Sequence, residues 1–505
     1  MQPTYIEIAQ VFSQDQRYTV PLFQRPYVWS REDQWEPLWD DILGVLRRLQ
    51  LRDGDSIVAN HFLGTIVLEQ KPTPTGSLPR REVIDGQQRL TTLQILLKAV
   101  VRHYMRLIVL DLDQGDEPQA IFETLNAHGT PLLPTDLIKN WLLWEAARQK
   151  LEPAPLYESF WRLFDRDHGY WRARVGTGHA ARARVDTFLQ NWLSKETSEA
   201  VSAKHLYDRF LRYAEGKGGA DTSQLGVPGL MASIHADALR FLKIDKPIGG
   251  RRFDLFLERL KRLDVIVFHP LLLEVMARTE ADPSEADEFG GILESYLVRR
   301  LVCGAQTRSY GSLAITILKA IRLQGHRRTC DVLREVLAAL TGTDEWPSDE
   351  AFYRNWTSRP FYGYFKRDRV LMILQALEHR YQSRNGKAEP LMSFDWSQLQ
   401  IEHVMPQAWE SHWPLPGGVS PEERKVNLQR IGNLTLVSGK LNSGLSNGPW
   451  LDLSEKQRGK RSGLHKHTML MINRNLLDEF QEWGDVAISA RADRLFADAK
   501  EIWPR

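Results

Sequence analysis

The sequence predicts an α+β protein that is mostly helical, with its strands confined to the two ends of the chain. The long middle of the chain carries apolar residues at helical spacing, joined by short connections. Apolar runs typical of strands occur on either side of this helical stretch. Together these patterns divide the 505 residues into three expected domains, which cover residues 1–148, 149–393 and 394–505.

The composition is that of a globular protein. Apolar residues make up 42% and charged residues 26% of the chain, which excludes a disordered chain or a fibre. No run of 18 apolar residues occurs, and the N-terminus lacks the features of a signal peptide, so we expect a cytoplasmic protein with no membrane partner. The two cysteines are too few for a four-cysteine zinc site. The net charge of +2 means that a nucleic-acid partner must be argued from local patches.

The first domain is expected to alternate strands and helices. A first helix follows Ser30, whose spacing to Asp33 resembles a capping box, and residues 71–79 form a loop because they carry three prolines and a glycine. A second helix starts after Asp85, the expected N-cap, with Gln88 as its partner in a capping box. The expected strands cover residues 18–22, 62–68, 82–84 and 107–110.

The last domain is expected to contain two short strands followed by helix. The strand-like segments cover residues 399–404 and 434–437. A long helical pattern then runs through Ile488 and Leu495 to Ile502.

The junction between the strand at 82–84 and the helix after it predicts a phosphate-binding site. Gly86 lets the backbone approach a ligand closely, and the free N–H groups of the first helical turn favour an anion. Arg89 adds a planar cation that fits phosphate oxygens. The alternative is a well-capped helix whose Arg89 pairs with an internal carboxylate. The sequence contains no Walker loop.

Residues 121–140 offer further candidates for a binding site. Helix capping explains most of this stretch, because Asn126 suits a C-cap and Thr135 suits the next N-cap. The polar side chains that remain as site candidates are Glu123, Asn126, Asp136 and Lys139.

A second pattern, near the C-terminus, suits phosphodiester hydrolysis. This reaction needs a base for water, a hard cation at the leaving oxygen and oxygen ligands for that cation. Glu402, His403 and an asparagine on a facing helix would supply all three. Neighbouring strand residues point to opposite faces, so Glu402 and His403 can serve one site only if the backbone bends there, as Pro406 makes plausible. The alternative is a structural Glu–His pair and a capping asparagine.

Several of these segments together resemble the GmrSD-type restriction endonucleases. The resemblance implies a small, mixed, ParB/sulfiredoxin-like N-terminal domain that binds and hydrolyses a nucleoside triphosphate and senses DNA. It also implies a helical coupling domain and a C-terminal HNH, or ββα-metal, nuclease domain. The N-terminal motifs occur in the family's order, as Val20–Trp29, Phe62–Ile66, Ile84–Leu90 and Leu125–Asn126 leading to Asn140.

The resemblance also implies a set of nucleotide-binding residues. GTP is the favoured nucleotide, with ATP or CTP as alternatives. Family members usually carry a longer helical stretch than residues 98–106 between the Arg89 helix and the next strand. The implied nucleotide site comprises Gln24, Arg25, Asp85, Gly86, Gln87, Gln88, Arg89, Asn126 and Lys139.

The nuclease roles follow from the same resemblance. In the HNH motif two asparagines nine positions apart follow the acid–histidine pair, as Asn433 and Asn442 do here. His403 would be the general base, Glu402 and Asn442 the ligands of Mg²⁺ or Mn²⁺, and Asn433 the residue that orients the base-bearing loop. Glu402 stands where an Asp is common in HNH enzymes.

Three groups of residues are expected to contact DNA. A basic stretch at 456–467 would follow backbone phosphates beside the cut, and a second basic group around residue 176 could do the same. An aromatic strand near the N-terminus would sense the modification. The alternatives are a solvated loop and ordinary core packing. The basic candidates are Arg458, Lys460 and Arg461, then Arg172, Arg174, Arg182 and Arg184; the sensing candidates are Tyr18, Val20, Pro21, Tyr27 and Trp29.

These inferences predict a nucleotide-regulated, modification-dependent DNA endonuclease of anti-phage defence that nicks or cuts. The expected partners are modified phage DNA or host-marked DNA, a nucleoside triphosphate and a second copy of the chain in a homodimer. One alternative is a nucleotide-gated DNA-binding regulator or clamp with an inactive nuclease domain. The other is an RNase or toxin-like nuclease that acts on the host.

Overall fold

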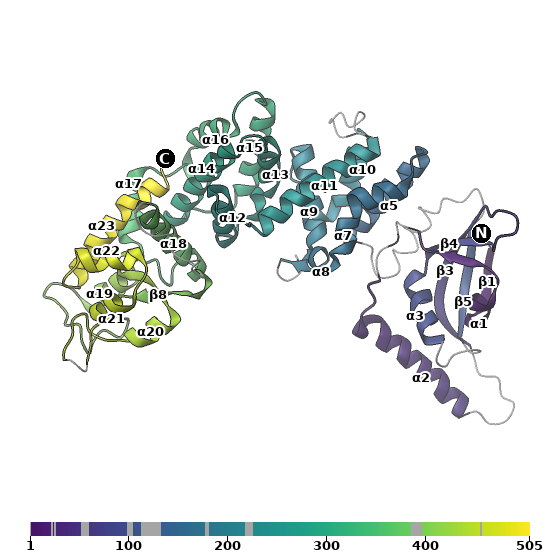
Figure 1. Cartoon of the computed structure of the whole chain (residues 1–505), viewed down its shortest axis with the longest axis horizontal. Helices are drawn as coiled ribbons and strands as arrows, with labels where there is room; N and C mark the ends of the chain where they lie inside the picture. The colour runs from purple at the N-terminus through teal and green to yellow at the C-terminus, as the bar shows by residue number, and fades with distance from the viewer. Residues whose placement is uncertain are drawn as a thin grey trace. The chain divides into compact units, whose positions relative to one another are not determined.

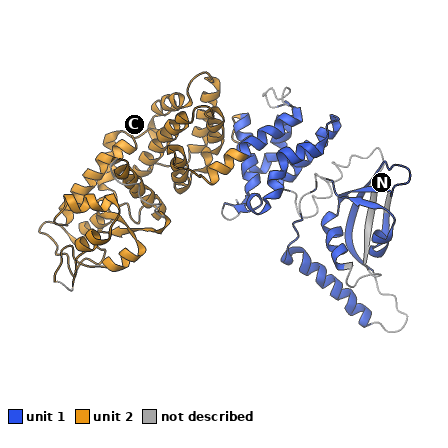
Figure 2. Ribbon diagram, viewed as in Figure 1, with its two compact units in different colours: residues 1–197, 201–238 blue, residues 198–200, 239–505 orange. Residues whose placement is uncertain are grey.

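The computed structural model describes residues 2–21, 24, 27–51, 60–97, 105–112, 133–176, 181–217, 226–384, 396–454 and 457–505. These residues are mostly helical, with one sheet toward each end, which confirms the predicted α+β class (Figure 1). A third, two-stranded sheet at residues 174–183 shows that the strands are not confined to the two ends. The chain forms two compact units (Figure 2): unit 1 holds residues 1–197 and 201–238, and unit 2 holds residues 198–200 and 239–505. Within the described residues, no helix has both the length and the apolar character that a bilayer crossing requires.

Unit 1 begins with a mixed five-stranded sheet. The strands are β1 (Gln2–Glu7), β2 (Arg17–Thr19), β3 (His61–Lys71), β4 (Arg80–Asp85) and β5 (Met105–Leu112), in the spatial order β1-β5-β3-β4-β2. β3 pairs in parallel with β5 and antiparallel with β4, and β2 is parallel to β4. The helices of this part are α1 (Ile8–Ser13), α2 (Glu36–Gln50) and α3 (Gln87–Leu97), and a π-helical turn at Arg31–Trp35 precedes α2.

The core of this part explains its alternating sequence pattern. Ile66 and Leu68 of β3, with Val83 of β4, are buried against Ile8, Ile42 and Leu90 from the three helices. The predicted strands at 62–68, 82–84 and 107–110 are confirmed as β3, β4 and β5.

Two local predictions at element boundaries need correction, and one holds. The strand expected at 18–22 ends at Thr19, because Pro21 has no N–H to donate to a ladder. Asp85 is not the N-cap of α3: the helix begins at Gln87, and the carbonyl of Gly86 accepts the N–H of Leu90 at 2.9 Å. The cap at Ser30 is confirmed, since its side chain accepts the N–H of Asp33.

The rest of unit 1 is helical and packs around aromatic rings. Trp161, Phe164, Trp171 and Phe188 form one buried cluster with ring centroids 4.9–5.8 Å apart. Its elements are α5 (Pro134–Arg148), α6 (Pro153–Leu156), a π-helical turn (Tyr157–Trp161), α7 (Arg162–Arg166), α8 (His168–Trp171), β6 (Arg174–Val175), β7 (Arg182–Ala183), α9 (Arg184–Thr197), a 3₁₀ turn (Ala203–His205), α10 (Leu206–Ala214) and the first part of α11 (Gly226–Asp245).

Unit 2 continues with helices that surround α14 (Pro283–Val302). The guanidinium of Arg299 in α14 is buried and donates from Nε to the carbonyl of Trp503 at 2.7 Å. The other elements are α12 (Arg252–Leu263), a 3₁₀ turn (Ile266–Phe268), α13 (His269–Arg278), α15 (Tyr310–Leu323), α16 (Thr329–Ala338), a 3₁₀ turn (Gly342–Asp344), α17 (Asp349–Ser358) and α18 (Arg367–Arg384).

The last part of unit 2 contains the two strands expected there. β8 (Leu399–His403) pairs antiparallel with β9 (Leu434–Ser438), and α20 (Gly439–Leu445) follows β9 directly. The remaining elements are 3₁₀ turns at Trp396–Gln398 and Ile431–Asn433, α19 (Pro421–Leu428), α21 (Lys460–His467), α22 (Met471–Glu479) and α23 (Asp485–Ile502), the long helix that the sequence predicts.

Gly432, just before β9, lies directly against the backbone of α23. A Cβ atom at this position would lie 1.9 Å from the carbonyl oxygen of Ile488. The absence of a side chain at Gly432 therefore allows α23 to pack behind the start of β9.

We predict that Gly432→Ala lowers the free energy of unfolding of unit 2 by about 3 kcal/mol, because the added methyl forces α23 away from β9. Urea denaturation measures this change. Gly311→Ala in α15 is the control, since a Cβ there meets no atom within 4 Å. Equal effects of the two substitutions would contradict the assigned packing.

Candidate functional site

The junction between β4 and α3 depends on a glycine, as the sequence predicts. Gly86 has φ +91°, and a Cβ at this position would lie 2.4 Å from Cγ2 of Ile66 in β3. Both the positive φ angle and the lack of space beside Ile66 therefore exclude a side chain at position 86. This close approach places the first turn of α3 directly beside β3.

Arg89 lies in the first turn of α3 and reaches back to β3. Its Nη1 donates to the carbonyl of Thr65. Gly64, with φ +100°, leaves the space for this side chain, since a Cβ there would lie 3.0 Å from Cζ of Arg89. The observed partner of Arg89 is therefore a backbone carbonyl and not the carboxylate that the alternative predicted.

Two other polar side chains at the junction have no internal partner. Oε1 of Gln87 is buried without a hydrogen-bond partner among the described residues. The half-buried carboxylate of Asp85 likewise forms no hydrogen bond or ion pair within the described part of the chain. Both groups are available to a ligand bound at the start of α3.

Gln24 connects this junction to the helices that follow. Its Nε2 donates to the carbonyl of Ile84 at 2.5 Å, and its own carbonyl accepts a hydrogen bond from Nζ of Lys139 at 3.0 Å. Lys139 is fully buried and also contacts Asp165 at 3.2 Å. Burial lowers the pKa of Lys139 despite this carboxylate. The structure therefore brings Gln24 and Lys139 to the predicted nucleotide motif.

The segment after Gln24 docks on α3. The N–H of Val28 donates to Oε1 of Gln88 at 2.8 Å. The hydroxyl of Tyr27 lies 2.6 Å from Oγ1 of Thr92, and it accepts the indole N–H of Trp35 at 2.8 Å. The aromatic sensing candidates therefore separate: Tyr27 contacts α3, Tyr18 packs on the sheet core, and Val20 is exposed.

In unit 2, β8 has a regular alternation of side chains. It stays in register through its last residue, where His403 pairs with Leu434 of β9. Glu402 and Gln400 consequently share one face, and His403 lies on the other with Ile401. The bend expected between Glu402 and His403 is not present within the strand.

Glu402 is held by Lys460, the first residue of α21. Nζ of Lys460 donates to Oε1 of Glu402 at 2.5 Å and to the backbone carbonyl of His403 at 2.8 Å. Burial raises the pKa of Glu402 and lowers that of Lys460, because it opposes both charges. Lys460 is only 2% exposed, so its predicted role as a surface DNA contact is wrong.

His403 occupies a largely buried position. Its Nε2 lies 3.1 Å from Oε1 of Gln429, and its ring stands edge-on to Tyr362 at a centroid distance of 4.7 Å. An amide oxygen only accepts, so Nε2 carries the hydrogen and Nδ1 is the basic nitrogen of the neutral ring. Burial lowers the pKa of His403 and favours this neutral form.

Asn433 links the start of β9 to the segment after His403. Its Oδ1 accepts the N–H of Met405 at 2.8 Å, and its Nδ2 donates to the carbonyls of Met405 at 2.9 Å and Leu428 at 3.0 Å. The indole of Trp483 also donates to Oδ1 at 3.2 Å. The side chain is fully buried, so these bonds fix the backbone that follows His403.

Asn442 projects from α20 toward the Glu402 face of β8. Its Nδ2 donates to Oε1 of Gln400 at 2.9 Å. Its Oδ1, the atom that a hard cation would use, has no hydrogen bond among the described residues.

Two models of known domains match the chain, one near each end. The GmrSD restriction endonuclease N-terminal domain matches residues 8–106, and the C-terminal domain of GmrSD restriction endonucleases matches residues 346–498. The chain belongs to the GmrSD restriction endonuclease family. The first match contains the β4–α3 junction with Gln24 but not Lys139, and the second contains Glu402, His403, Asn433 and Asn442. No curated protein matches the sequence of this GmrSD-family chain.

Glu402 and Asn442 are the residues of this GmrSD-family chain that could hold a divalent cation. One carboxylate and one amide oxygen are the hard ligands that Mg²⁺ and Mn²⁺ accept. The carboxylate of Glu402 accepts Nζ of Lys460 at Oε1 and a backbone hydrogen bond from His403, whereas Oδ1 of Asn442 accepts no described donor. Water would complete the coordination of such an ion.

Several predicted site residues of the GmrSD-family chain take other positions. Arg172 is not a surface group, because its guanidinium is buried and paired with Asp136 at 2.7 Å. Arg184 lies over the ring of Tyr170, and Arg461 donates to the carbonyl of Leu477 at 2.9 Å. The predicted residues Arg25, Glu123 and Asn126 lie outside the described residues. Arg458 is exposed, Arg174 and Arg182 bond within unit 1 to Ala181 and Gln190, and Pro21 and Trp29 are half-buried.

Sequence reasoning missed Gln400, Gln429 and Tyr362, which contact the predicted nuclease residues. Gln400 could have been found from the strand period, since it precedes Glu402 by two positions and must share its face. Gln429 and Tyr362 come from other segments, and no local pattern marks them.

The two asparagines differ in a way that denaturation can measure. We predict that Asn433→Ala lowers the free energy of unfolding of unit 2 by about 3 kcal/mol, because it leaves buried backbone groups without partners. Asn442→Ala is the matched control and should cost less than about 1 kcal/mol, since it loses one half-buried bond. Similar losses in urea denaturation for both variants would contradict this assignment.

Proposed function

We propose that this GmrSD-family chain is a nucleotide-regulated, modification-dependent DNA endonuclease of anti-phage defence. The observation that supports this proposal most is the arrangement of Glu402 on β8, Asn433 in the turn just before the antiparallel strand β9, and Asn442 on the helix that follows β9. This is the order of elements expected of an HNH nuclease domain. DNA is the substrate that a restriction endonuclease cuts.

In this proposal different side chains of the site carry out different steps of hydrolysis. His403 accepts the proton of the attacking water at Nδ1, while Gln429 holds the ring through Nε2. Glu402 and Asn442 would hold Mg²⁺ or Mn²⁺, which would supply positive charge at the leaving oxygen. Because Glu402 and His403 leave β8 on opposite faces, the phosphodiester must lie across the end of the strand to reach both.

The proposed nucleotide site is the β4–α3 junction. The N–H groups at the start of α3 suit the phosphates of a nucleoside triphosphate, with GTP favoured over ATP and CTP. Asp85 and Gln87 offer unpartnered oxygens beside these N–H groups. The hydrogen bonds of Gln24 connect the junction to α5, so a change at the nucleotide can reach the helices of unit 1.

A second candidate function is a nucleotide-gated DNA-binding regulator with an inactive nuclease domain. Two contacts favour it, because each involves a side chain that hydrolysis would need. Lys460 bonds to Glu402, and Gln429 bonds to His403. This candidate predicts nucleotide turnover and DNA binding without strand cleavage. Testing RNA as a substrate beside DNA distinguishes a DNA endonuclease from an RNase or toxin-like nuclease.

For the nuclease, we predict cleavage of at least one member of a panel of modified DNAs, and only with Mg²⁺ or Mn²⁺ present. His403→Ala, Glu402→Gln and Asn442→Ala should each slow cleavage about a hundredfold or more. Mn²⁺ binding, measured by electron paramagnetic resonance, should persist in His403→Ala and weaken in the other two variants.

The control for this experiment is His412→Ala, an exposed histidine of the same unit. Nucleotide turnover with no cleavage of any DNA would support the regulator instead. Cleavage of RNA but not DNA would support the toxin-like nuclease. Equal Mn²⁺ binding by all variants would remove Glu402 and Asn442 from the metal site.

For the nucleotide site, we predict that Arg89→Ala reduces nucleoside triphosphate hydrolysis about tenfold or more, because a guanidinium beside the phosphates is lost. Mn²⁺ binding at the nuclease site should not change. Arg48→Ala on α2, an exposed arginine, is the control. Turnover by Arg89→Ala equal to that of the parent, with GTP, ATP and CTP each tested, would exclude Arg89 from the site.

A further inference from the structure

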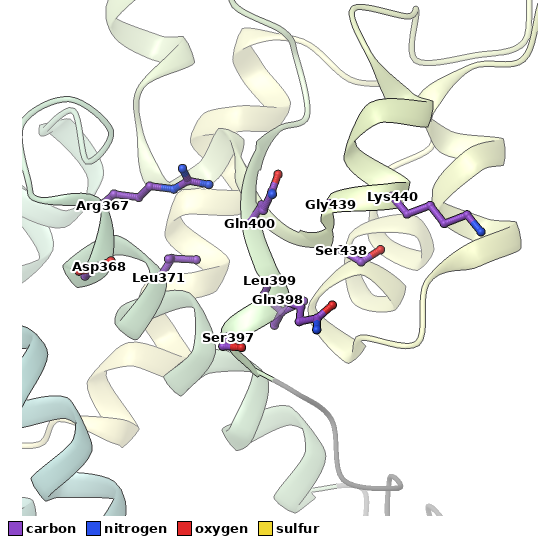
Figure 3. Close-up of a pocket in the computed structure, with 10 residues that line it drawn as sticks. All are labelled: Arg367, Asp368, Leu371, Ser397, Gln398, Leu399, Gln400, Ser438, Gly439 and Lys440. Atoms are coloured by element: carbon purple, nitrogen blue, oxygen red, sulfur yellow. The ribbon is translucent and has the colours of Figure 1, made fainter. Parts of the chain in front are cut away.

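A cleft of about 540 Å³ lies beside the proposed nuclease site in unit 2. Its walls come from the start of α18, from β8 with the turn before it, and from the start of α20 (Figure 3). The lining residues include two cations and one carboxylate, Asp368, and no aromatic ring. The residues that the argument uses are Arg367, Gln400, Gly439 and Lys440.

Arg367 is the main cation of this cleft. It is exposed and has no ion pair or side-chain hydrogen bond within the described part of the chain. It is the first residue of α18, where the positive end of the helix dipole disfavours a cation. Figure 3 shows its side chain extending from α18 toward Gln400. The fold gains no stability from this charge, which leaves a ligand as its natural partner.

Gln400 joins the cleft to the proposed metal ligand. Its Oε1 accepts the hydrogen bond from Asn442, while its Nε2 has no acceptor among the described residues. A Cβ at Gly439 would lie 3.1 Å from this Nε2, so the glycine leaves room beside a free N–H donor. Lys440 follows at the rim, with its ammonium reaching outward in Figure 3. The lining holds two cations and the Gln400 donor against one carboxylate, Asp368, so its net charge is positive and favours an anion.

We propose that the cleft binds a backbone phosphate of the DNA strand being cut, next to the scissile phosphate. The inference rests on the proposed nuclease function. Gln400 and Glu402 lie two residues apart on one face of β8, about 7 Å, which matches the spacing of neighbouring phosphates on one strand. A guanidinium fork suits the oxygens of a phosphodiester. The absence of an aromatic ring from the lining removes the stacking partner that a free nucleotide base would need.

The test uses the full chain carrying His403→Ala, so that DNA is bound without being cut, and a short fluorescein-labelled duplex of the modified DNA that the parent cleaves. Adding Arg367→Gln should weaken binding about tenfold. The slope of log affinity against log salt concentration should fall by about 1. Arg308→Gln, another exposed arginine of unit 2 without a described partner, should leave both quantities unchanged.

A second measurement identifies the phosphate. Duplexes with a single uncharged methylphosphonate should bind the parent about tenfold less tightly at one position beside the cut, and Arg367→Gln should show no further loss at that position. Unchanged affinity and salt slope in Arg367→Gln would overturn the proposed phosphate site in the cleft, and so would a methylphosphonate effect in that variant as large as in the parent. Cleavage by the wild-type chain would still support the nuclease function in either case. Absence of both cleavage and DNA binding in the wild-type chain would overturn the two proposals together.

Discussion

The geometry of the proposed nuclease site depends on one buried amide. The side chain of Asn433 hydrogen-bonds to both the N–H and the carbonyl of Met405. It also donates to the carbonyl of Leu428 and accepts the indole N–H of Trp483. These bonds tie the chain after β8 to the start of β9, although 28 residues separate Met405 from Asn433. Without this tie the loop between the strands would be free to move, and the position of His403 would move with it.

The N-terminal junction is organised by close approach of backbone rather than by a buried amide. Gly86 and Gly64 each occupy a position where a side chain would collide with Ile66 or with Arg89. As a result the side chain of Arg89 reaches the carbonyl of Thr65 in β3.

Much of this could be predicted from the sequence, because period and capping are local. The strands around Ile66 and Val83, the cap at Ser30 and the β8–β9 pair were all readable. The short β1 and α1 were missed, since six residues carry too little periodicity. The burial of Lys460 was also missed: a basic stretch looks the same whether its lysine meets solvent or Glu402, and only the tertiary fold decides.

The position of α23 behind the strands has a consequence for how the protein matures. Arg491 donates to the carbonyls of Gly432 and Leu434, at 2.7 Å each, on either side of Asn433. α23 leaves the ribosome after every strand and helix of the nuclease site. A nascent chain therefore cannot complete the packing on either side of Asn433 until α23 has been synthesised.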